Sequence, residues 1–303
     1  MASDNVSPMQ PYIKLIKNIF FDKKLLNVLL VLLNVLTASI AFGLASRTIF
    51  PDAQNYIDLA ESIFNGNFSS VCGLSSCLPD TVRTPGYPLI LSAFFYFSHN
   101  LLLIKLAQLL FYFITLRLGY LILMKISNNN LINGNIFLLF TAFNIQIPYY
   151  SGSISSETFT TFLVVLFFYR LIVKDGNQLW KDALVSGMVL GSLYYLRPGF
   201  LLFPFILLGL SIFRGLNLNP KFISMQIFFF VLLLLPFGTW NYMNHGVFKI
   251  SPIGVSGMVA LNGYWYFKLP HGYVNTYMWN EVVVPDVTNP FPNIKREKEL
   301  NRL

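Results

Sequence analysis

The chain has 303 residues, of which 55% are hydrophobic, 17% are aromatic and only 11% are charged. A soluble domain carries roughly 25% charged residues, and a single core cannot hide this much apolar surface. The composition therefore excludes an ordinary soluble protein and indicates an integral membrane protein. The net charge of +8 does not indicate nucleic-acid binding, because excess Lys and Arg in membrane proteins mark the cytoplasmic ends of helices.

Residues 1–24 are predicted to form a cytoplasmic amphipathic lead-in. The apolar run 25–45 follows Lys23 and Lys24 and is longer than the apolar core of a signal peptide. It therefore predicts a retained first helix, with its N-terminal end inside and residue 46 outside.

The outer loop 46–100 is the one long polar interval in the first half of the chain. Within it, residues 53–65 carry apolar side chains at helical spacing with acids between them, which predicts a short helix on the membrane surface. Residues 89–97 are too few to span a bilayer, so they predict a second interfacial helix, or a re-entrant one, on the same side.

Further apolar segments bring the predicted number of spanning helices to about seven. They are 101–126, 132–150, 158–173, 183–196, 200–213 and 222–240. Residues 25–240 are thus predicted to form an all-α transmembrane bundle, and residues 241–303 an extracytoplasmic segment.

The distribution of cations supports this layout. Those that fall inside are Lys14, Lys17, Lys23, Lys24, Lys125, Arg170, Lys174, Lys181, Arg214 and Lys221. Before residue 241, those at the outer side are Arg47, Arg83, Lys105 and Arg197, and Arg117 lies within a helix. This asymmetry follows the positive-inside rule, and counting residues 89–97 as a span would invert every later loop.

Ionisable side chains collect at the predicted outer ends of the helices, where they often mark a site. Asp52 is a candidate general base, and the alternative is that it only caps the helix that follows. Glu157 is a candidate site residue or simply a favourable first-turn acid, and Arg197 suits a lipid phosphate or snorkels to the headgroups. Arg83 opens the run Arg-Thr-Pro-Gly-Tyr-Pro, a rigid turn suited to holding an anion.

The two cysteines, Cys72 and Cys77, lie in the predicted outer loop. An extracytoplasmic location favours a disulfide between them, with free thiols as the alternative. The three histidines are scattered, so no metal site is predicted. Gly187 and Gly191 have the small-xxx-small spacing of close helix packing.

The order of these features resembles the GT-C glycosyltransferases that use sugars linked to polyprenyl or dolichyl phosphate, including protein O-mannosyltransferases and aminoarabinose lipid A transferases. The resemblance spans roughly residues 25–265 and follows the first helix in chain order. Its runs are Pro51-Asp52-Ala53-Gln54-Asn55-Tyr56, Asn65-Gly66-Asn67-Phe68, Arg83-Thr84-Pro85-Gly86-Tyr87-Pro88, Ser156-Glu157, Leu196-Arg197-Pro198, Pro236-Phe237-Gly238-Thr239-Trp240-Asn241-Tyr242 and Gly246-Val247-Phe248.

The resemblance implies an inverting transfer of a sugar to an extracytoplasmic glycan, lipid or protein. Asp52 would be the general base, and Arg83 and Arg197, with His271 as a third candidate, would stabilise the phosphate. Glu157 would orient the sugar or acceptor, or pair with an arginine, while Tyr56 and Tyr87 would flank the site. The implied partners are membrane lipid, the lipid-linked donor and the acceptor, with no nucleic acid and no metal cofactor. The implied location is a multi-pass protein of a bacterial inner membrane.

The chain is expected to be short relative to this family, whose members usually continue with more helices. Two alternatives stay open. One is a polymerase or ligase of surface glycans, which also has polar outer loops. The other is a non-catalytic membrane protein, such as a transporter or a truncated scaffold subunit. A transporter should show broken helices and charged residues near the middle of the membrane, and the predicted spans show little of that, with Arg117 as the main exception.

Overall fold

The computed structural model describes residues 23–47, 52–72, 77–80, 83–173, 179–211 and 219–252, without the side chains of residues 70–72, 77 and 78. The predicted lead-in over residues 1–22, most of the predicted extracytoplasmic segment and His271 lie outside these ranges.

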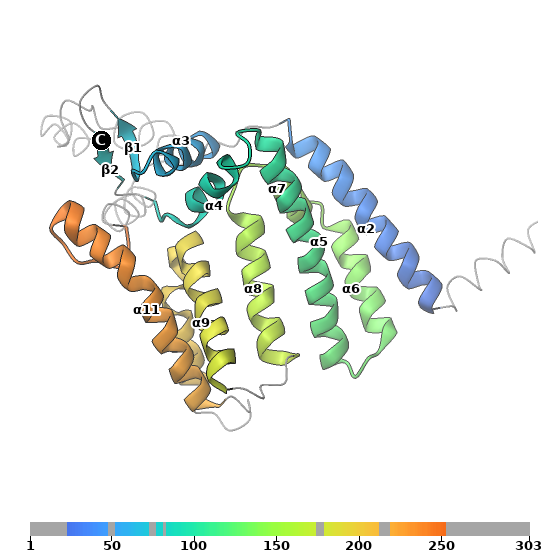
Figure 1. The fold of residues 1–303 in the computed structure, drawn as a ribbon. Helices are drawn as coiled ribbons and strands as arrows, with labels where there is room; N and C mark the ends of the chain where they lie inside the picture. The colour runs from blue at the N-terminus through green and yellow to red at the C-terminus, as the bar shows by residue number, and fades with distance from the viewer. Residues whose placement is uncertain are drawn as a thin grey trace, which may run out of the picture.

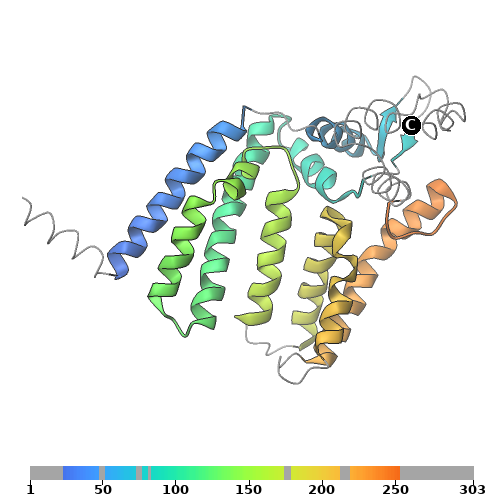
Figure 2. The same cartoon turned by 180° about the vertical axis from the view of Figure 1, so that it is seen from behind.

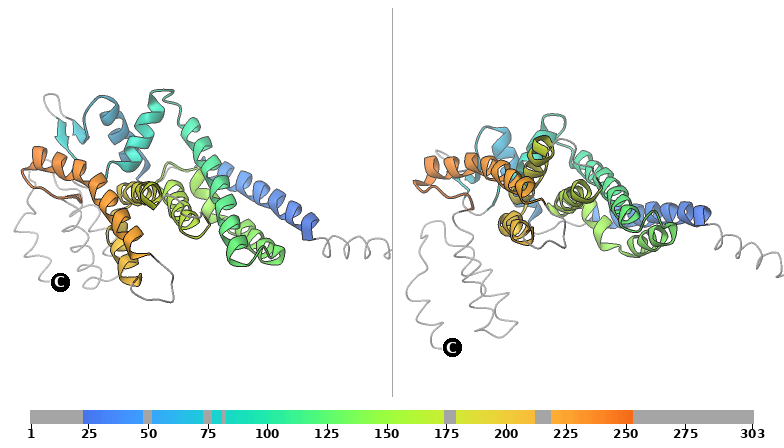
Figure 3. Two further views of the ribbon diagram at one scale, coloured as in Figure 1. Left: turned by 60° about the horizontal axis from the view of Figure 1, so that its bottom comes forward. Right: turned by 90° about the horizontal axis from the view of Figure 1, so that it is seen from below.

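Most described helices stand side by side in one bent row, with α2 at one edge and α11 at the other (Figures 1 and 3). The row consists of α2 (Lys23–Ala45), α6 (Leu131–Phe143), α5 (Leu101–Ile126), α8 (Glu157–Ile172), α9 (Leu179–Leu196), α10 (Phe203–Leu210) and α11 (Pro220–His245). Two short helices connect members of the row: α7 (Gln146–Ser151) leads from α6 to α8, and the 3₁₀ helix η1 (Pro198–Leu202) leads from α9 to α10. Apart from the hairpin described next, every described element is helical, as the sequence predicted.

Two short helices and a hairpin lie across one end of the row, which we call the α3–α4 end (Figures 1 and 2). They are α3 (Ala53–Phe64), α4 (Gly86–Phe95) and the antiparallel strands β1 (Ser69–Cys72) and β2 (Cys77–Pro79). The sequence predicted both helices, but it did not predict the hairpin, whose register places the backbones of Cys72 and Cys77 opposite each other.

By length and apolar character, three described helices could cross a membrane: α2, α5 and α11, with 23, 26 and 26 residues. Helices α4 and α6 and residues 198–210 are apolar but shorter. Two predicted segments are interrupted. The segment 132–150 breaks between Phe143 and Gln146, where Pro148 has no backbone N–H to donate to the carbonyl of Asn144. The segment 200–213 begins as η1, which starts at Pro198, before α10.

Asparagine side chains begin three of the helices. Asn100, Asn130 and Asn219 each accept a hydrogen bond from a backbone N–H in the first turn of α5, α6 and α11, at 2.9, 3.0 and 3.0 Å. Such caps satisfy N–H groups that have no partner within the helix. Helix α11 also contains Pro236 in its interior, which removes one helical hydrogen bond.

The buried side chains form two clusters. One joins α3 and α4 to the adjoining ends of α5, α8 and α9, and includes Leu91 and Phe159. The other lies between α8, α9, α10 and α11, and includes Tyr194, Phe230 and Leu234. Because the first cluster rests on the row of helices, α3 and α4 are held in place by apolar packing rather than only by their loops.

The close approach predicted at Gly187 and Gly191 is present between α9 and α11. A Cβ at Gly187 would lie 2.7 Å from the carbonyl oxygen of Gln226 and 2.7 Å from the Cβ of Phe229. A Cβ at Gly191 would lie 3.1 Å from the Cβ of Leu233. The absence of side chains at the two glycines therefore sets the distance between these helices.

We predict that Gly187→Val destabilises the protein by about 1–3 kcal/mol, because the new side chain overpacks a contact with backbone. The matched control is Gly43→Val in α2, where nothing lies within 4 Å of the added Cβ. The measurement is the unfolding of both purified variants in detergent. Equal stability of the two variants would contradict the tight α9–α11 contact.

Candidate functional site

Asp52 and Arg83 form an ion pair at the α3–α4 end. Asp52 immediately precedes α3, Arg83 lies just before α4, and Arg83 Nη2 is 2.7 Å from Asp52 Oδ1. The side chain of Asp52 is 60% exposed, whereas that of Arg83 is only 20% exposed. Asp52 occupies the N-cap position of α3 but makes no side-chain capping bond, so the capping interpretation is wrong.

Two further contacts hold Arg83. Its backbone N–H donates to the buried carboxylate of Asp80 at 2.7 Å, and its guanidinium carbon lies 4.7 Å from the ring centroid of Tyr56. Burial alone would lower the pKa of Arg83, but the hydrogen bond to Asp52 and the interaction with Tyr56 outweigh it and leave this pKa raised. The guanidinium is therefore a permanent cation in a fixed position.

Tyr87 connects this pair to the interior. Its ring packs edge-on against that of Tyr56, with centroids 4.9 Å apart, and its hydroxyl donates to Oε1 of Gln108 on α5 at 2.9 Å. Gln108 Nε2 in turn donates to the backbone oxygens of Ser151 and Ser153, at 3.1 and 2.6 Å. Tyr87 and Gln108 are both almost fully buried, so these bonds fix α4 to α5 and to the loop before α8.

The environment of Tyr87 keeps its hydroxyl neutral. Burial raises its pKa well above the ordinary value, and the nearby Tyr56 and Glu157 raise it further, against a lowering contribution from a backbone hydrogen bond at Ser155. The phenol is therefore a hydrogen-bond donor at any physiological pH, and Glu157 lies close enough to interact with it.

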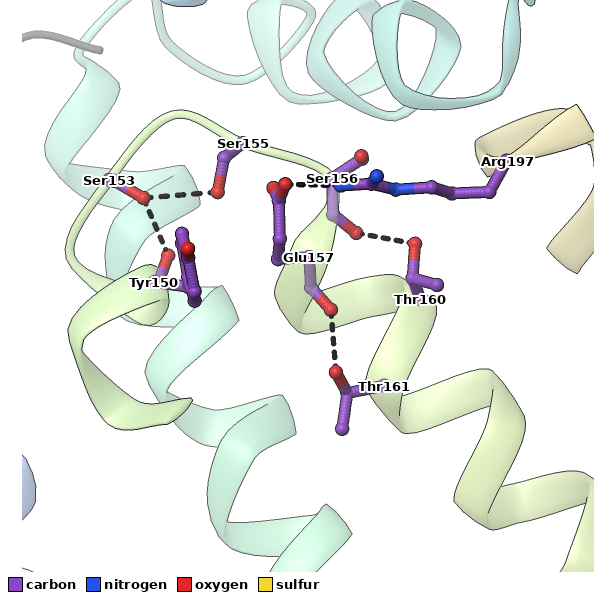
Figure 4. Close-up of polar contacts among 8 residues, drawn as sticks. All are labelled: Tyr150, Ser153, Ser155, Ser156, Glu157, Thr160, Thr161 and Arg197. Atoms are coloured by element: carbon purple, nitrogen blue, oxygen red, sulfur yellow. Dashed lines mark hydrogen bonds and ion pairs between the residues drawn. The ribbon is translucent and has the colours of Figure 1, made fainter. Parts of the chain in front are cut away.

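Glu157 and Arg197 form a second ion pair between the start of α8 and the end of α9 (Figure 4). The Glu157 carboxylate accepts a hydrogen bond from Arg197 Nη2, and the two side chains are 33% and 48% exposed. Ser156 is at the N-cap of α8 without a side-chain cap bond, and the Ser155 hydroxyl instead lies 3.0 Å from that of Ser153. The pairing thus replaces the interpretations of Glu157 as only a first-turn acid and of Arg197 as only a snorkelling cation.

Gly86 brings the Arg83 turn against the end of α9. A Cβ at this position would lie 2.5 Å from the carbonyl carbon of Tyr195 and 2.9 Å from the backbone N of Leu196. Only a residue without a side chain permits this approach, which sets the first residue of α4 beside the backbone that leads into Arg197. The predicted residues Asp52, Tyr56, Arg83, Tyr87, Glu157 and Arg197 are therefore gathered at one end of the molecule.

A groove opens next to the two ion pairs. It has a volume of about 490 Å³ and lies between α3, the hairpin, the start of α4, α9 and α11. Its lining includes Pro85, two residues after Arg83, and Tyr195, two residues before Arg197. The other lining residues are Ile63, Gly66, Asn67, Phe68, Leu89, Leu233, Pro236, Phe237 and Trp240. The lining is almost entirely apolar, so the groove suits a hydrocarbon chain.

The structure does not describe the side chains of the three remaining predicted site residues. His271 lies outside the described residues, and so do the side chains of Cys72 and Cys77, so their disulfide stays a prediction. Within the described ranges, no group of three or more His, Cys, Asp or Glu side chains could hold a metal ion.

Sequence reasoning missed Gln108 and Asp80. Gln108 is fully buried and forms hydrogen bonds to two separate segments. The sequence feature that pointed to it was a polar amide within a long apolar helix. Asp80 fixes the backbone of Arg83, and its signal was an acid three residues before that arginine. No protein family, curated protein or solved structure matches the chain.

We predict that Tyr87→Phe destabilises the protein by about 1–3 kcal/mol, because it leaves the buried Gln108 amide oxygen without its donor. The control is Tyr96→Phe, which removes a hydroxyl from a tyrosine that is 73% exposed. Unfolding in detergent is the measurement, and an equal effect of the two substitutions would contradict the anchoring role of Tyr87.

Proposed function

We propose that this protein is an inverting glycosyltransferase that moves a sugar from a polyprenyl-phosphate carrier to an extracytoplasmic acceptor. The observation that carries the proposal is the pair of carboxylate–guanidinium contacts at one end of the molecule, beside an apolar groove. A lipid-phosphate sugar needs this combination of a hydrocarbon site, cations for a phosphate and a carboxylate that can take a proton. The proposal agrees with the resemblance of the chain to GT-C glycosyltransferases.

The proposed topology is a multi-pass bundle of about seven spans with the α3–α4 end outside the cytoplasm. In support, basic residues gather at the other end of the described helices. Lys23, Lys181 and Lys221 lie in the first turns of α2, α9 and α11, and Lys125 and Arg170 lie in the last turns of α5 and α8. Cations with this distribution support a cytoplasmic location for that end of the helices.

The proposed mechanism begins with the donor in the groove, its phosphate facing Arg83 and Arg197. The Asp52 carboxylate takes the proton from an acceptor hydroxyl, and the hydroxyl oxygen forms a bond to the anomeric carbon. The bond from that carbon to the phosphate oxygen breaks, and the electron pair leaves with the polyprenyl phosphate. The two guanidinium groups stabilise the phosphate charge, and attack opposite the leaving group inverts the anomeric configuration.

The ion pair of Asp52 with Arg83 fits both roles. A guanidinium has five N–H donors, so Arg83 can hold the carboxylate with one edge and the phosphate with another. Asp52 is also the more exposed partner, so an acceptor can reach it from water. Glu157 positions Arg197 in the same way and lies where it can accept hydrogen bonds from a sugar hydroxyl. These contacts support the assignment of the two arginines to the donor and of Asp52 to the acceptor.

We predict that Asp52→Asn lowers the rate of transfer by about 10²–10⁴-fold, because the amide cannot accept the acceptor proton. The measurement is transfer of labelled sugar from polyprenyl-phosphate donors by the purified full chain. The matched control is Asp58→Asn on the same helix, where an exposed carboxylate bonds only Gln54 within the described contacts. If Asp52→Asn kept full activity while substitutions of Arg83 and Arg197 abolished it, the result would favour the polymerase or ligase alternative.

We also predict that Arg83→Gln and Arg197→Gln each lower kcat/KM for the donor by about 100-fold, because each removes a cation from the departing phosphate. Arg47→Gln removes an exposed cation near the same end, at the end of α2, and should leave kcat/KM unchanged. Steady-state kinetics over a range of donor concentrations is the measurement. If all three variants behaved alike, the assignment of a phosphate to Arg83 and Arg197 would be wrong.

A further inference from the structure

A second pocket lies between α2, α5 and α6, in the half of these helices away from α3 and α4. Its volume is about 230 Å³. It is lined by Asn27, Val31, Asn34, Val35, Phe113, Leu116, Arg117, Tyr120 and Leu138. The proposed transfer reaction uses none of these residues, although the pocket combines apolar walls with a cation and two amides.

Arg117 is the cation of this pocket. It lies within α5, one of the helices long and apolar enough to cross a membrane. Its guanidinium carbon is 5.9 Å from the ring centroid of Tyr120, and no carboxylate of the described residues pairs with it. A cation at this depth is costly unless an anion or polar group accompanies it, so an intramembrane arginine without a carboxylate indicates an anionic ligand.

The two amides differ in how well they are satisfied. Asn27 Nδ2 donates to the Tyr120 hydroxyl at 3.1 Å and to Asn135 Oδ1 at 2.9 Å. Asn34 Nδ2 donates to the backbone oxygens of Leu30 and Leu138, both at 2.8 Å. Asn34 Oδ1, however, is buried without a hydrogen-bond partner, although the residue is only 2% exposed. This oxygen is enclosed by the protein, so the charged group that the pocket offers to a ligand is the guanidinium of Arg117.

The nearby ends of the helices add positive charge. Lys23 and Lys24 begin α2, and Lys125 lies in the last turn of α5. Lysines at a membrane surface attract anionic headgroups, and they repel the quaternary ammonium of a choline headgroup. The lysines at the helix ends and the exposed guanidinium of Arg117 on the pocket lining thus favour the same class of ligand.

We propose that this pocket binds one anionic phospholipid. The phosphate pairs with Arg117, and one acyl chain follows the apolar wall along Val31 and Val35. The lipid joins α2 to α5 and is distinct from the polyprenyl-phosphate donor, which is assigned to the opposite end of the molecule. The site requires no transfer activity, so it is independent of the proposed reaction.

Native mass spectrometry of the purified full chain, delipidated in detergent, tests the site. Phosphatidylglycerol and phosphatidylcholine with identical acyl chains are added in turn. We expect phosphatidylglycerol to be retained about tenfold better, and Arg117→Leu to remove this preference, as expected for the loss of a charge-assisted contact with phosphate. The matched variant Lys105→Leu removes a different cation of α5, which contacts the Ser46 carbonyl at the far end of the helix, and should leave the preference intact.

A second pair of variants covers the outcome in which Arg117→Leu fails to fold. Val31→Trp fills the pocket while keeping Arg117, whereas Val28→Trp adds the same bulk at a neighbouring position on α2 outside the pocket lining. We expect only Val31→Trp to lose the bound lipid. Retention of phosphatidylglycerol by Val31→Trp, or by a folded Arg117→Leu, overturns the proposal. So does equal retention of the two lipids, or displacement of the lipid by millimolar inorganic phosphate.

Discussion

The arrangement at the α3–α4 end depends on the buried amide of Gln108. In apolar surroundings this amide must have hydrogen-bond partners, and it finds them on two segments that are distant in the chain, Tyr87 and the loop at Ser151 and Ser153. These bonds fix the position of α4 relative to α5 and the path of the loop that leads into α8. Arg83 lies just before α4, and Glu157 begins α8. The two ion pairs therefore take their positions from a contact that neither of them makes.

The α3–α4 end, where the two ion pairs lie, has two different environments. On one side, the exposed Asp52 carboxylate is open to water. On the other side, the apolar groove begins beside Pro85 and Tyr195. Gly86 keeps the Arg83 turn close to the backbone of α9, because it has no side chain that would hold the two apart. In the proposed reaction, a water-borne acceptor and a membrane-borne donor would thus approach the same arginines from different phases.

The sequence predicted the helical class, the long apolar helices α2, α5 and α11 and the short helices α3 and α4, because each leaves a local apolar pattern. The breaks near Asn144 and at η1 were missed, since long apolar runs conceal proline-induced interruptions. The pairing of Asp52 with Arg83, 31 positions apart, was not derivable, because capping gave an equally good local explanation. Gln108 was overlooked for a related reason: a lone amide in an apolar helix has no partner that sequence alone can name.

Pro236 makes one wall of the groove easier to bend. Helix α11 supplies one wall, and Pro236 both lines that wall and interrupts the backbone hydrogen bonds inside the helix. Helices bend most readily at such positions, so the part of α11 that carries Phe237 and Trp240 can tilt without disturbing the tight glycine contact with α9 lower down. The wall that α11 supplies is therefore the one at which the width of the groove can change.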